Sequence, residues 1–240
     1  MTTRAEMLDC VRKALGRPNP SSPVTPLPRL DLEGVMPPLA PEGYLAKFEA
    51  EWEKVAGVAY RVANTEELIA VLEKILAPTE THAVALSGNP LLAELHIADY
   101  LTATHKIVTS WGHGQGVAGT KSLPDFNKAS FAAGAGITGV DFVLAESGTL
   151  VLSSATEGVQ VASLAPPIHI AFYRRRQLLG SLDDVLARLP ISNSKDQSSS
   201  GRSVVFITGT SRTADIEQIL IRGVHGPREA HAILVEDSCR

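Results

Sequence analysis

The sequence predicts an α/β protein built on a mixed, mostly parallel β-sheet that is covered on both faces by helices. Two observations predict this fold class. From Glu42 onward, short apolar runs typical of strands alternate with segments of helical periodicity, which is the pattern of parallel strands joined by helices. Within residues 141–153 the order changes, because only four residues separate two strand patterns. That spacing leaves no room for a crossover helix and requires an antiparallel hairpin.

The elements follow in order along this alternating region. Thr65 is placed to cap one helix, whose first turn is acidic, and Gly134 is placed to end another. The turn Ser87–Pro90 ends a strand, and residues 192–200 form a polar loop. The expected helices are 43–56, 66–76, 91–101, 123–133, 182–189 and 214–221. The expected strands are 58–63, 82–86, 106–110, 141–144, 149–153, 168–173, 204–208 (a buried strand) and 231–235.

The N-terminal region differs in composition from the rest. Residues 4–15 have the apolar spacing of a short amphipathic helix. Eight of the 15 prolines follow between Pro18 and Pro41, which excludes a regular helix or a central strand there. We expect residues 1–41 to form a helix and an extended arm, and residues 42–240 to form a single domain. Whether the arm docks on protein surface or is a mobile tether stays open.

Composition excludes several classes of protein. With 26 acidic and 22 basic residues the net charge is −4, which argues against nucleic acid or an anionic membrane as the main partner. No apolar run is long enough for a transmembrane helix, and the N-terminus lacks the apolar core of a signal peptide. Cys10 and Cys239 are too few to hold an iron–sulfur cluster, which needs four protein ligands. We therefore expect a cytoplasmic protein with no cofactor of its own.

Glu146 is the first candidate catalytic residue. It lies in the expected hairpin turn, between two apolar strands and beside Gly148, which permits tight backbone geometry. A carboxylate held between buried strands is either paired or has a perturbed pKa, and such groups serve as nucleophiles or acid–base catalysts. The alternative is a turn glutamate that faces water or caps an amide.

The second candidate is a hydroxyl-rich loop between the expected strand 204–208 and the expected helix from Ala214. Free amides at a helix start favour an anion, and the Arg212 guanidinium suits a carboxylate or phosphate. Asp215 and Glu217 would oppose an anion there, so a simple helix cap with a solvated arginine is the alternative. The loop residues concerned are Gly209, Thr210, Ser211, Arg212 and Thr213.

Two histidines could take part in proton transfer. His225 lies between flexible positions, next to Gly226, and could exchange a proton near neutral pH. His169 follows two prolines at the start of an expected strand. For each, a structural histidine without a functional role is the alternative.

Other features carry weaker predictions. Residues 111–116 follow a strand end but no helix pattern follows them, so a nucleotide loop is disfavoured. Residues 173–176 are expected to be the solvated end of a strand. No histidine pair or carboxylate cluster has clear ligand spacing, so no bound metal is predicted.

Three segments carry a family resemblance. The runs GITGVDFVLAESGTLVLSS, PPIHI and GTSRTADIEQILIRGVHGP together resemble the lactate-utilization protein C (LUD domain) family, in the same order and over about residues 43–237. The resemblance implies a three-layer α/β/α domain similar to the sugar-phosphate isomerase and CoA-transferase superfold. It also implies a role in cytoplasmic oxidation of L-lactate to pyruvate with two partner subunits that carry iron–sulfur clusters.

We therefore expect a non-redox subunit of a lactate-oxidising system that binds a small carboxylate or phosphorylated ligand, organises its iron–sulfur partners, or does both. Glu146 and His225 would be catalytic. The expected ligand-binding residues are Ser147, Gly148, Thr149, His169, Gly209, Thr210, Ser211, Arg212, Thr213 and Gly226.

Two other hypotheses stay open. The chain could be a stand-alone acyl or CoA transferase, since Glu146-Ser147-Gly148 is similar to the nucleophile motif of such enzymes. Those transferases usually pair two related domains, and this chain has one. It could also be a scaffold that acts through its N-terminal arm and has no small-molecule site.

Overall fold

The computed structural model of the chain divides into two units, Met1–Pro38 and Leu39–Arg240. The structure describes residues 3–16, 39–77, 82–112, 119–120, 122–189, 203–213, 221–223 and 225–239. In the first unit, α1 (Arg4–Ala14) is the expected amphipathic helix, and Thr3 and Glu6 form a capping box at its start. None of its residues is buried. Most of the expected arm, residues 17–38, lies outside the described residues.

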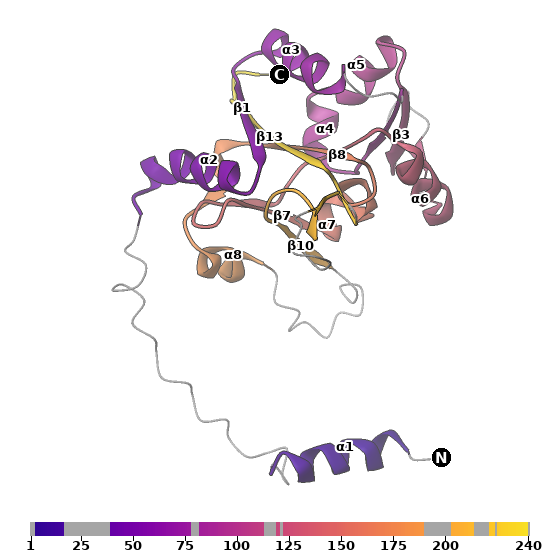
Figure 1. Cartoon of the computed structure of the whole chain (residues 1–240), viewed down its shortest axis with the longest axis vertical. Helices are drawn as coiled ribbons and strands as arrows, with labels where there is room; N and C mark the ends of the chain where they lie inside the picture. Colours follow the sequence, from indigo (N-terminus) through magenta and orange to yellow (C-terminus); the bar gives the residue numbers. More distant parts are fainter. Residues whose placement is uncertain are drawn as a thin grey trace. The chain divides into compact units, whose positions relative to one another are not determined.

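The second unit is built on a seven-stranded sheet in which all neighbouring strands are parallel (Figure 1). The two middle strands β8 and β5 are buried at every residue, as expected for a parallel sheet covered on both faces. The strands are, in spatial order, β1 (Gly57–Val62), β13 (Glu229–Val235), β8 (Ile168–Tyr173), β5 (Ala135–Thr138), β2 (Ala83–Leu86), β3 (Ile107–Trp111) and β4 (Gly119–Thr120).

Helices cover both faces of this sheet (Figure 1). On one face, α3 (Thr65–Leu76), α4 (Pro90–Glu94) and α5 (Ile97–Ala103) pack their apolar sides into a single cluster with the strands. On the other face, α2 (Tyr44–Lys54) and α6 (Leu123–Ala132) form two further clusters. The three-layer α/β fold is therefore confirmed. No described helix is long and apolar enough to cross a membrane.

A second, four-stranded sheet packs beside α2. The expected hairpin is confirmed, because β6 (Phe142–Leu144) and β7 (Thr149–Ser153) pair antiparallel, with Val143 opposite Leu150. The outer strands are β10 (Val204–Ile207) and β9 (Leu178–Leu179), and α8 (Leu182–Arg188) covers part of the sheet. The second sheet is mixed, because β6 pairs antiparallel with β7 but parallel with β9, whereas the main sheet is parallel throughout.

Several expected elements differ in detail. The expected helix 91–101 is two helices, α4 and α5. They are separate because His96, just before α5, has a left-handed backbone (φ 51°). The helix cap is Asn64, whose side chain accepts from the Glu67 amide, and not Thr65. The strand 204–208 lies at the edge of the second sheet and is half exposed, so the expectation of a buried strand is wrong.

The C-terminal region corrects two further predictions. Ile221 belongs to a short strand, β12 (Ile221–Arg222), which pairs antiparallel with β11 (Arg212–Thr213), so the helix expected over 214–221 is wrong at its last residue. Residues 214–220 lie outside the described residues. Strand β5 was not predicted, although it lies between β8 and β2 in the sheet.

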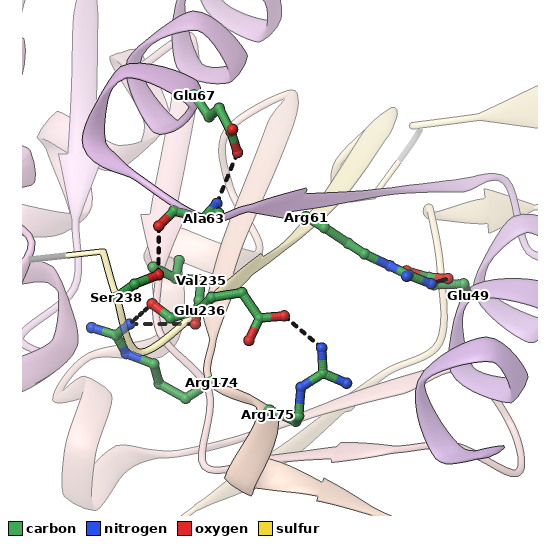
Figure 2. Close-up of polar contacts among 9 residues, drawn as sticks. All are labelled: Glu49, Arg61, Ala63, Glu67, Arg174, Arg175, Val235, Glu236 and Ser238. Carbon is green, nitrogen blue, oxygen red and sulfur yellow. Dashed lines mark hydrogen bonds and ion pairs between the residues drawn. The ribbon is translucent and has the colours of Figure 1, made fainter. Parts of the chain in front are cut away.

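Arg174 was expected to be solvated, but its side chain is only 2 % exposed. Its guanidinium donates to the carbonyl oxygens of Val235 and Glu236 (Figure 2). It also donates to the carbonyl oxygen of Cys239 and forms an ion pair with Glu94 at 2.6 Å. The expectation failed because the chain following β13 turns back over the end of β8. A buried guanidinium is held there by carbonyl groups that would otherwise lack donors.

Candidate functional site

The loops that follow the neighbouring strands β2 and β5 leave the carboxyl edge of the main sheet in opposite directions. After β2 the chain enters α4, which packs on one face, whereas after β5 it continues through Val140 into the cluster on the opposite face. Neighbouring strands whose following loops leave toward opposite faces form a topological switch point. Open α/β sheets bind their ligands at such points, outside the carboxyl ends of the strands.

A buried carboxylate, Glu157, joins the two loops at this point. Glu157 ends the short helix α7 (Ser154–Glu157), and it has no exposed surface. Its carboxylate accepts hydrogen bonds from the Ser87 hydroxyl at 2.5 Å, from the Asn89 side-chain amide, and from the Gly139 backbone amide at 3.2 Å. The loop after β2 and the loop after β5 therefore depend on one side chain for their relative position.

Burial dominates the electrostatics of this carboxylate. Loss of solvation raises the pKa of Glu157 to about 7, and the nearby charge of Asp141 acts in the same direction. The donors from Ser87, Asn89 and Gly139 act in the opposite direction without offsetting the burial. The pKa of Glu157 therefore lies near neutral pH, and a buried carboxyl group of this kind beside the ends of parallel strands is a candidate functional group.

A pocket of about 480 Å³ opens at the same edge of the sheet. Its floor includes Ser87 and Asn89, which are the two side-chain partners of Glu157, and one wall carries Trp111 at the end of β3. The described residues that line it are Leu86, Ser87, Gly88, Asn89, Leu92, Ala93, His96, Ala98, Asp99, Ser110 and Trp111. Apolar walls with a few convergent polar groups are typical of a small-molecule site.

Two glycines hold Trp111 in place. A Cβ atom at Gly158 would lie 2.1 Å from the indole Nε1 atom, so only a glycine lets the ring lie against the residue after Glu157. A Cβ atom at Gly88 would lie 3.2 Å from the Trp111 carbonyl oxygen. The other side of the indole meets Phe126 in an edge contact, with the ring centroids 5.4 Å apart. The indole is thus positioned by its surroundings before any ligand binds.

Because Glu157 is fully buried, it does not line the pocket and would act through Ser87 and Asn89. It was not identified from the sequence, and neither were its partners, although the turn Ser87–Pro90 was recognised as a strand end. The available signal was a lone acidic residue shortly after the buried strand β7. Its role depends on residues 70 and 68 positions earlier in the chain, which no local pattern connects to it.

The turn that holds Glu146 lies elsewhere, next to α2 and α8. The Glu146 carboxylate accepts a hydrogen bond from the Leu182 amide, at the start of α8, over 3.0 Å. Gly148 has a left-handed backbone (φ 61°), and a Cβ atom there would lie 2.5 Å from the Trp52 amide nitrogen. The turn is therefore pressed against α2, and the Glu146 carboxylate supports a helix end.

The loop expected to bind an anion does lie beside this turn. A chain of hydroxyl groups runs from Ser147 through Thr149 to Thr208, with 2.8 Å between successive oxygens. Next along the chain, Gly209 packs on Val55 and the Thr210 amide donates to the Val55 carbonyl oxygen at 3.4 Å. The two turns, distant in sequence, thus meet at the C-terminal end of α2.

The amides of this loop are already used by the protein. Besides Thr210, the Ser211 amide donates to the Pro227 carbonyl oxygen at 3.0 Å, and Arg212 and Thr213 form strand β11 and not the start of a helix. The expected helix start at Ala214 lies outside the described residues, so the anion site there stays a prediction. The Arg212 side chain is exposed and has no ion-pair partner among the described residues.

The two histidines are far from equivalent. His225 is exposed, while Gly226 next to it packs against the Ser211 side chain, where a Cβ atom would lie 3.1 Å from Ser211 Cβ. His169 is buried in β8 and its Nε2 atom lies 2.9 Å from the Thr138 hydroxyl. Burial lowers the pKa of His169 to about 3, so the ring is uncharged at neutral pH. The structure does not bring His169 to the surface beside His225.

The predicted residues around His225 lie at the opposite edge of the main sheet from the Glu157 site. The segment from Gly223 to Arg228 precedes β13, and the Arg228 amide bonds to Pro167, which precedes β8. These residues therefore lie at the amino edge of the parallel sheet, while Ser87, Asn89 and Gly139 follow the carboxyl ends. In the part of the chain that the structure describes, no three histidine, cysteine, aspartate or glutamate side chains are grouped as metal ligands.

A parallel sheet with helices on both faces and a buried carboxylate beside its switch point defines an α/β protein with a candidate ligand site at the carboxyl edge. Residues 45–235 match the model of the LUD domain, and the chain belongs to the LUD domain family.

Some relatives match most of the chain, and others match about half of it. It is 29 % identical over 174 residues to the lactate utilization protein C of Halalkalibacterium halodurans, covering 72 % of this chain and 71 % of that one. It is 26 % identical over 237 residues to the protein of that name from Deinococcus radiodurans, which covers 97 % of this chain and 95 % of that one. The Bacillus subtilis protein is 38 % identical over 112 residues, 46 % of this chain and 45 % of that one.

A solved structure shows the same fold. The crystal structure of a DUF162 family protein from Deinococcus radiodurans superimposes with a TM-score of 0.55 at 22 % identity. The match covers 82 % of this chain and 99 % of that one. At this identity the likeness concerns the fold alone.

Proposed function

We propose that the chain acts in lactate utilization and binds a small molecule at the carboxyl edge of its main sheet. Membership of the LUD domain family and the names of its relatives support the first part. The clamp formed by Glu157 supports the second, because it arranges two loops of a switch point beneath a pocket. That clamp is the observation on which the ligand site rests.

Growth on L-lactate tests this proposal. A strain lacking the chain would receive one of three genes: the wild type, the double variant Ser110→Ala/Trp111→Leu, or the control variant Phe131→Ala. Phe131 is 74 % exposed and does not line the pocket. We expect the double variant to fail on L-lactate but grow on glucose, and the control to grow on both. Normal growth of a folded double variant on L-lactate would contradict the pocket's role.

We propose further that the chain is a non-redox component of a cytoplasmic lactate-oxidising system, working with two iron–sulfur subunits. Its family resemblance supports these partners, and its two cysteines are too few to ligate a cluster alone. Co-purification with a tagged full chain tests the association. Repeating the co-purification with residues 1–41 deleted tests whether the N-terminal region mediates the association. If it does, neither iron–sulfur subunit should be recovered with the truncated chain.

The joined turns at α2 are a second candidate ligand site. The hydroxyl chain from Ser147 to Thr208 supports it, and the exposed Arg212 guanidinium offers a charge for an anion. Arg212→Ala should then abolish growth on lactate while the protein stays folded. For the transferase alternative, incubation with acyl-CoA and mass spectrometry should show an adduct on Glu146; an unmodified Glu146 removes that alternative.

A further inference from the structure

We propose that the pocket beside Trp111 binds an uncharged ligand that carries a planar ring and neighbouring hydroxyl groups, such as a nucleoside, and that it does not bind free lactate. This inference rests on the proposal that the pocket is the chain's ligand site. Three properties of the described lining carry it: its charge, its aromatic wall and its hydrogen-bonding groups.

The charge of the lining disfavours a small anion. Among the described residues that line the pocket, none is lysine or arginine, and Asp99 contributes a carboxylate. The remaining titratable group, His96, lies 3.2 Å from Asp99, so a proton on its ring would be matched by that carboxylate. Glu157 lies directly beneath Ser87 and Asn89 and adds a second acidic group. A carboxylate ligand would lose its hydration here without gaining an opposite charge.

The size and wall of the pocket favour a larger molecule with a ring. Its volume of about 480 Å³ is within the range of sites for drug-sized ligands, whereas lactate has only three carbon atoms. Leu86 and Leu92 contribute apolar surface to the same lining as Trp111. The indole is held by Gly88, Gly158 and Phe126, so stacking a ring on it costs little ordering of the protein.

The free polar groups suit hydroxyls. Ser87 and Asn89 direct their side chains to Glu157, which leaves Ser110 and Asp99 to contact a ligand. The Ser110 hydroxyl has no partner among the described residues, and it can donate or accept. One oxygen of Asp99, Oδ2, lies 3.2 Å from His96 Nδ1, so the other oxygen can accept from one ligand hydroxyl while Ser110 accepts from its neighbour. The sugar of a nucleoside offers such a pair of donors, and lactate offers one hydroxyl beside a negative charge.

Titration calorimetry on the full chain at pH 7.5 tests the inference, with adenosine, ribose and L-lactate as separate probes. We expect adenosine to bind, ribose to bind at least tenfold more weakly, and lactate to give no signal at the same concentration. Asp99→Asn should weaken adenosine at least fivefold, and Trp111→Leu should abolish its binding. Asp183→Asn, a change of an exposed acid on α8 outside the pocket, should leave the affinity unchanged.

Fluorescence gives a second readout. The chain has two tryptophans, and Trp52 is fully buried in the core, so a ligand on the indole of Trp111 should quench only that emission. Adenosine should quench the wild type, and it should have no effect on Trp111→Leu.

Two results would overturn the inference: lactate binding as tightly as adenosine, or no binding of adenosine by a folded wild-type chain. Growth on L-lactate separates these from the proposed function. If the Trp111 variant loses growth while adenosine fails to bind, the pocket is needed and only the ligand class is wrong. If that variant grows normally, the proposed site itself falls, whatever the calorimetry shows.

Discussion

At the scale of single residues, the main finding is a glutamate that two loops use as a common acceptor. Glu157 is buried with three donors, from Ser87, Asn89 and Gly139, and yet burial raises its pKa to about 7. The balance shows that hydrogen bonds compensate only part of the lost hydration. Its protonation is thus coupled to two loops, of which the one after β2 lines the pocket.

Replacing Glu157 with glutamine should change the pH dependence of stability. The pKa in the folded state is above the ordinary value of 4.5, so the folded state holds a proton that the unfolded state releases between about pH 4.5 and 7. The wild-type free energy of unfolding should therefore fall by about 3 kcal/mol, relative to the variant, as pH rises through this window. Urea unfolding at pH 4.5, 6 and 8 measures it.

The glutamine variant loses the hydrogen bond from Asn89, which lowers its stability by about 1 kcal/mol at every pH, so only the slope is diagnostic. Glu66→Gln, an exposed change in the first turn of α3, should run parallel to the wild type. Parallel curves for Glu157→Gln and the wild type would show that Glu157 has an ordinary pKa.

At the scale of elements, the end of β8 anchors the chain after β13. Arg174 and Arg175 are adjacent, but Arg174 is buried beneath three carbonyl oxygens, while the side chain of Arg175 is 55 % exposed and pairs with the Glu236 carboxylate (Figure 2). The pair therefore separates the effect of a buried network from that of a surface ion pair.

We expect Arg174→Met to lower the free energy of unfolding by about 3 kcal/mol, because the carbonyl oxygens of Val235, Glu236 and Cys239 lose their donor. Arg175→Met, the matched control, should cost less than about 1 kcal/mol, since exposed ion pairs contribute little. Denaturant unfolding of both variants measures the difference. Equal losses would mean that Arg174 is not the anchor.

Strand β5 is the element that sequence patterns failed to identify. Only Ile137 and Thr138 in this four-residue strand favour β-structure, whereas Ala135 and Gly136 are small and have low strand propensity. Their size is nevertheless required, because a Cβ atom at Gly136 would lie 1.8 Å from the carbonyl oxygen of Ala162 in η2 (Gln160–Ser163). The close approach of two backbones explains why a glycine occupies position 136, whereas strand propensity does not.

Gly136→Ala should therefore destabilise the protein by about 2 kcal/mol or more, through displacement of η2 from the sheet. Gly112→Ala is the control: no atom lies within 4 Å of a Cβ there, so only the strain of its positive φ applies, about 1 kcal/mol. Thermal unfolding followed by circular dichroism measures both. A smaller effect at Gly136 than at Gly112 would contradict the tight contact.

At the scale of the whole molecule, the core is confined to the second unit. Helix α1 buries none of its residues, and the four core clusters of the described residues begin at Leu45. We expect residues 39–240 to fold without Met1–Pro38 and to keep the melting temperature of the full chain within about 2 °C. Circular dichroism of the truncated protein measures this. A drop of 10 °C would show that the first unit contributes to the core.

Local patterns were sufficient for much of the fold. Alternating strand and helix periods determined the α/β class, and four residues between two strands determined the hairpin, because chain geometry permits no other connection at that length. Apolar periodicity likewise located α2, α3 and β8, since each buries one stripe or both faces.

The sequence by itself thus determined the class of fold and most of its elements, because these depend on the spacing of apolar residues along short segments. Only the tertiary structure decided which polar residues meet. It placed the histidine and arginine motifs at the amino edge of the sheet, and it placed Glu157 beneath Ser87 and Asn89 at the carboxyl edge. The physical reason is that burial and pairing of a charge depend on segments brought together by strand order, over about 70 positions of chain.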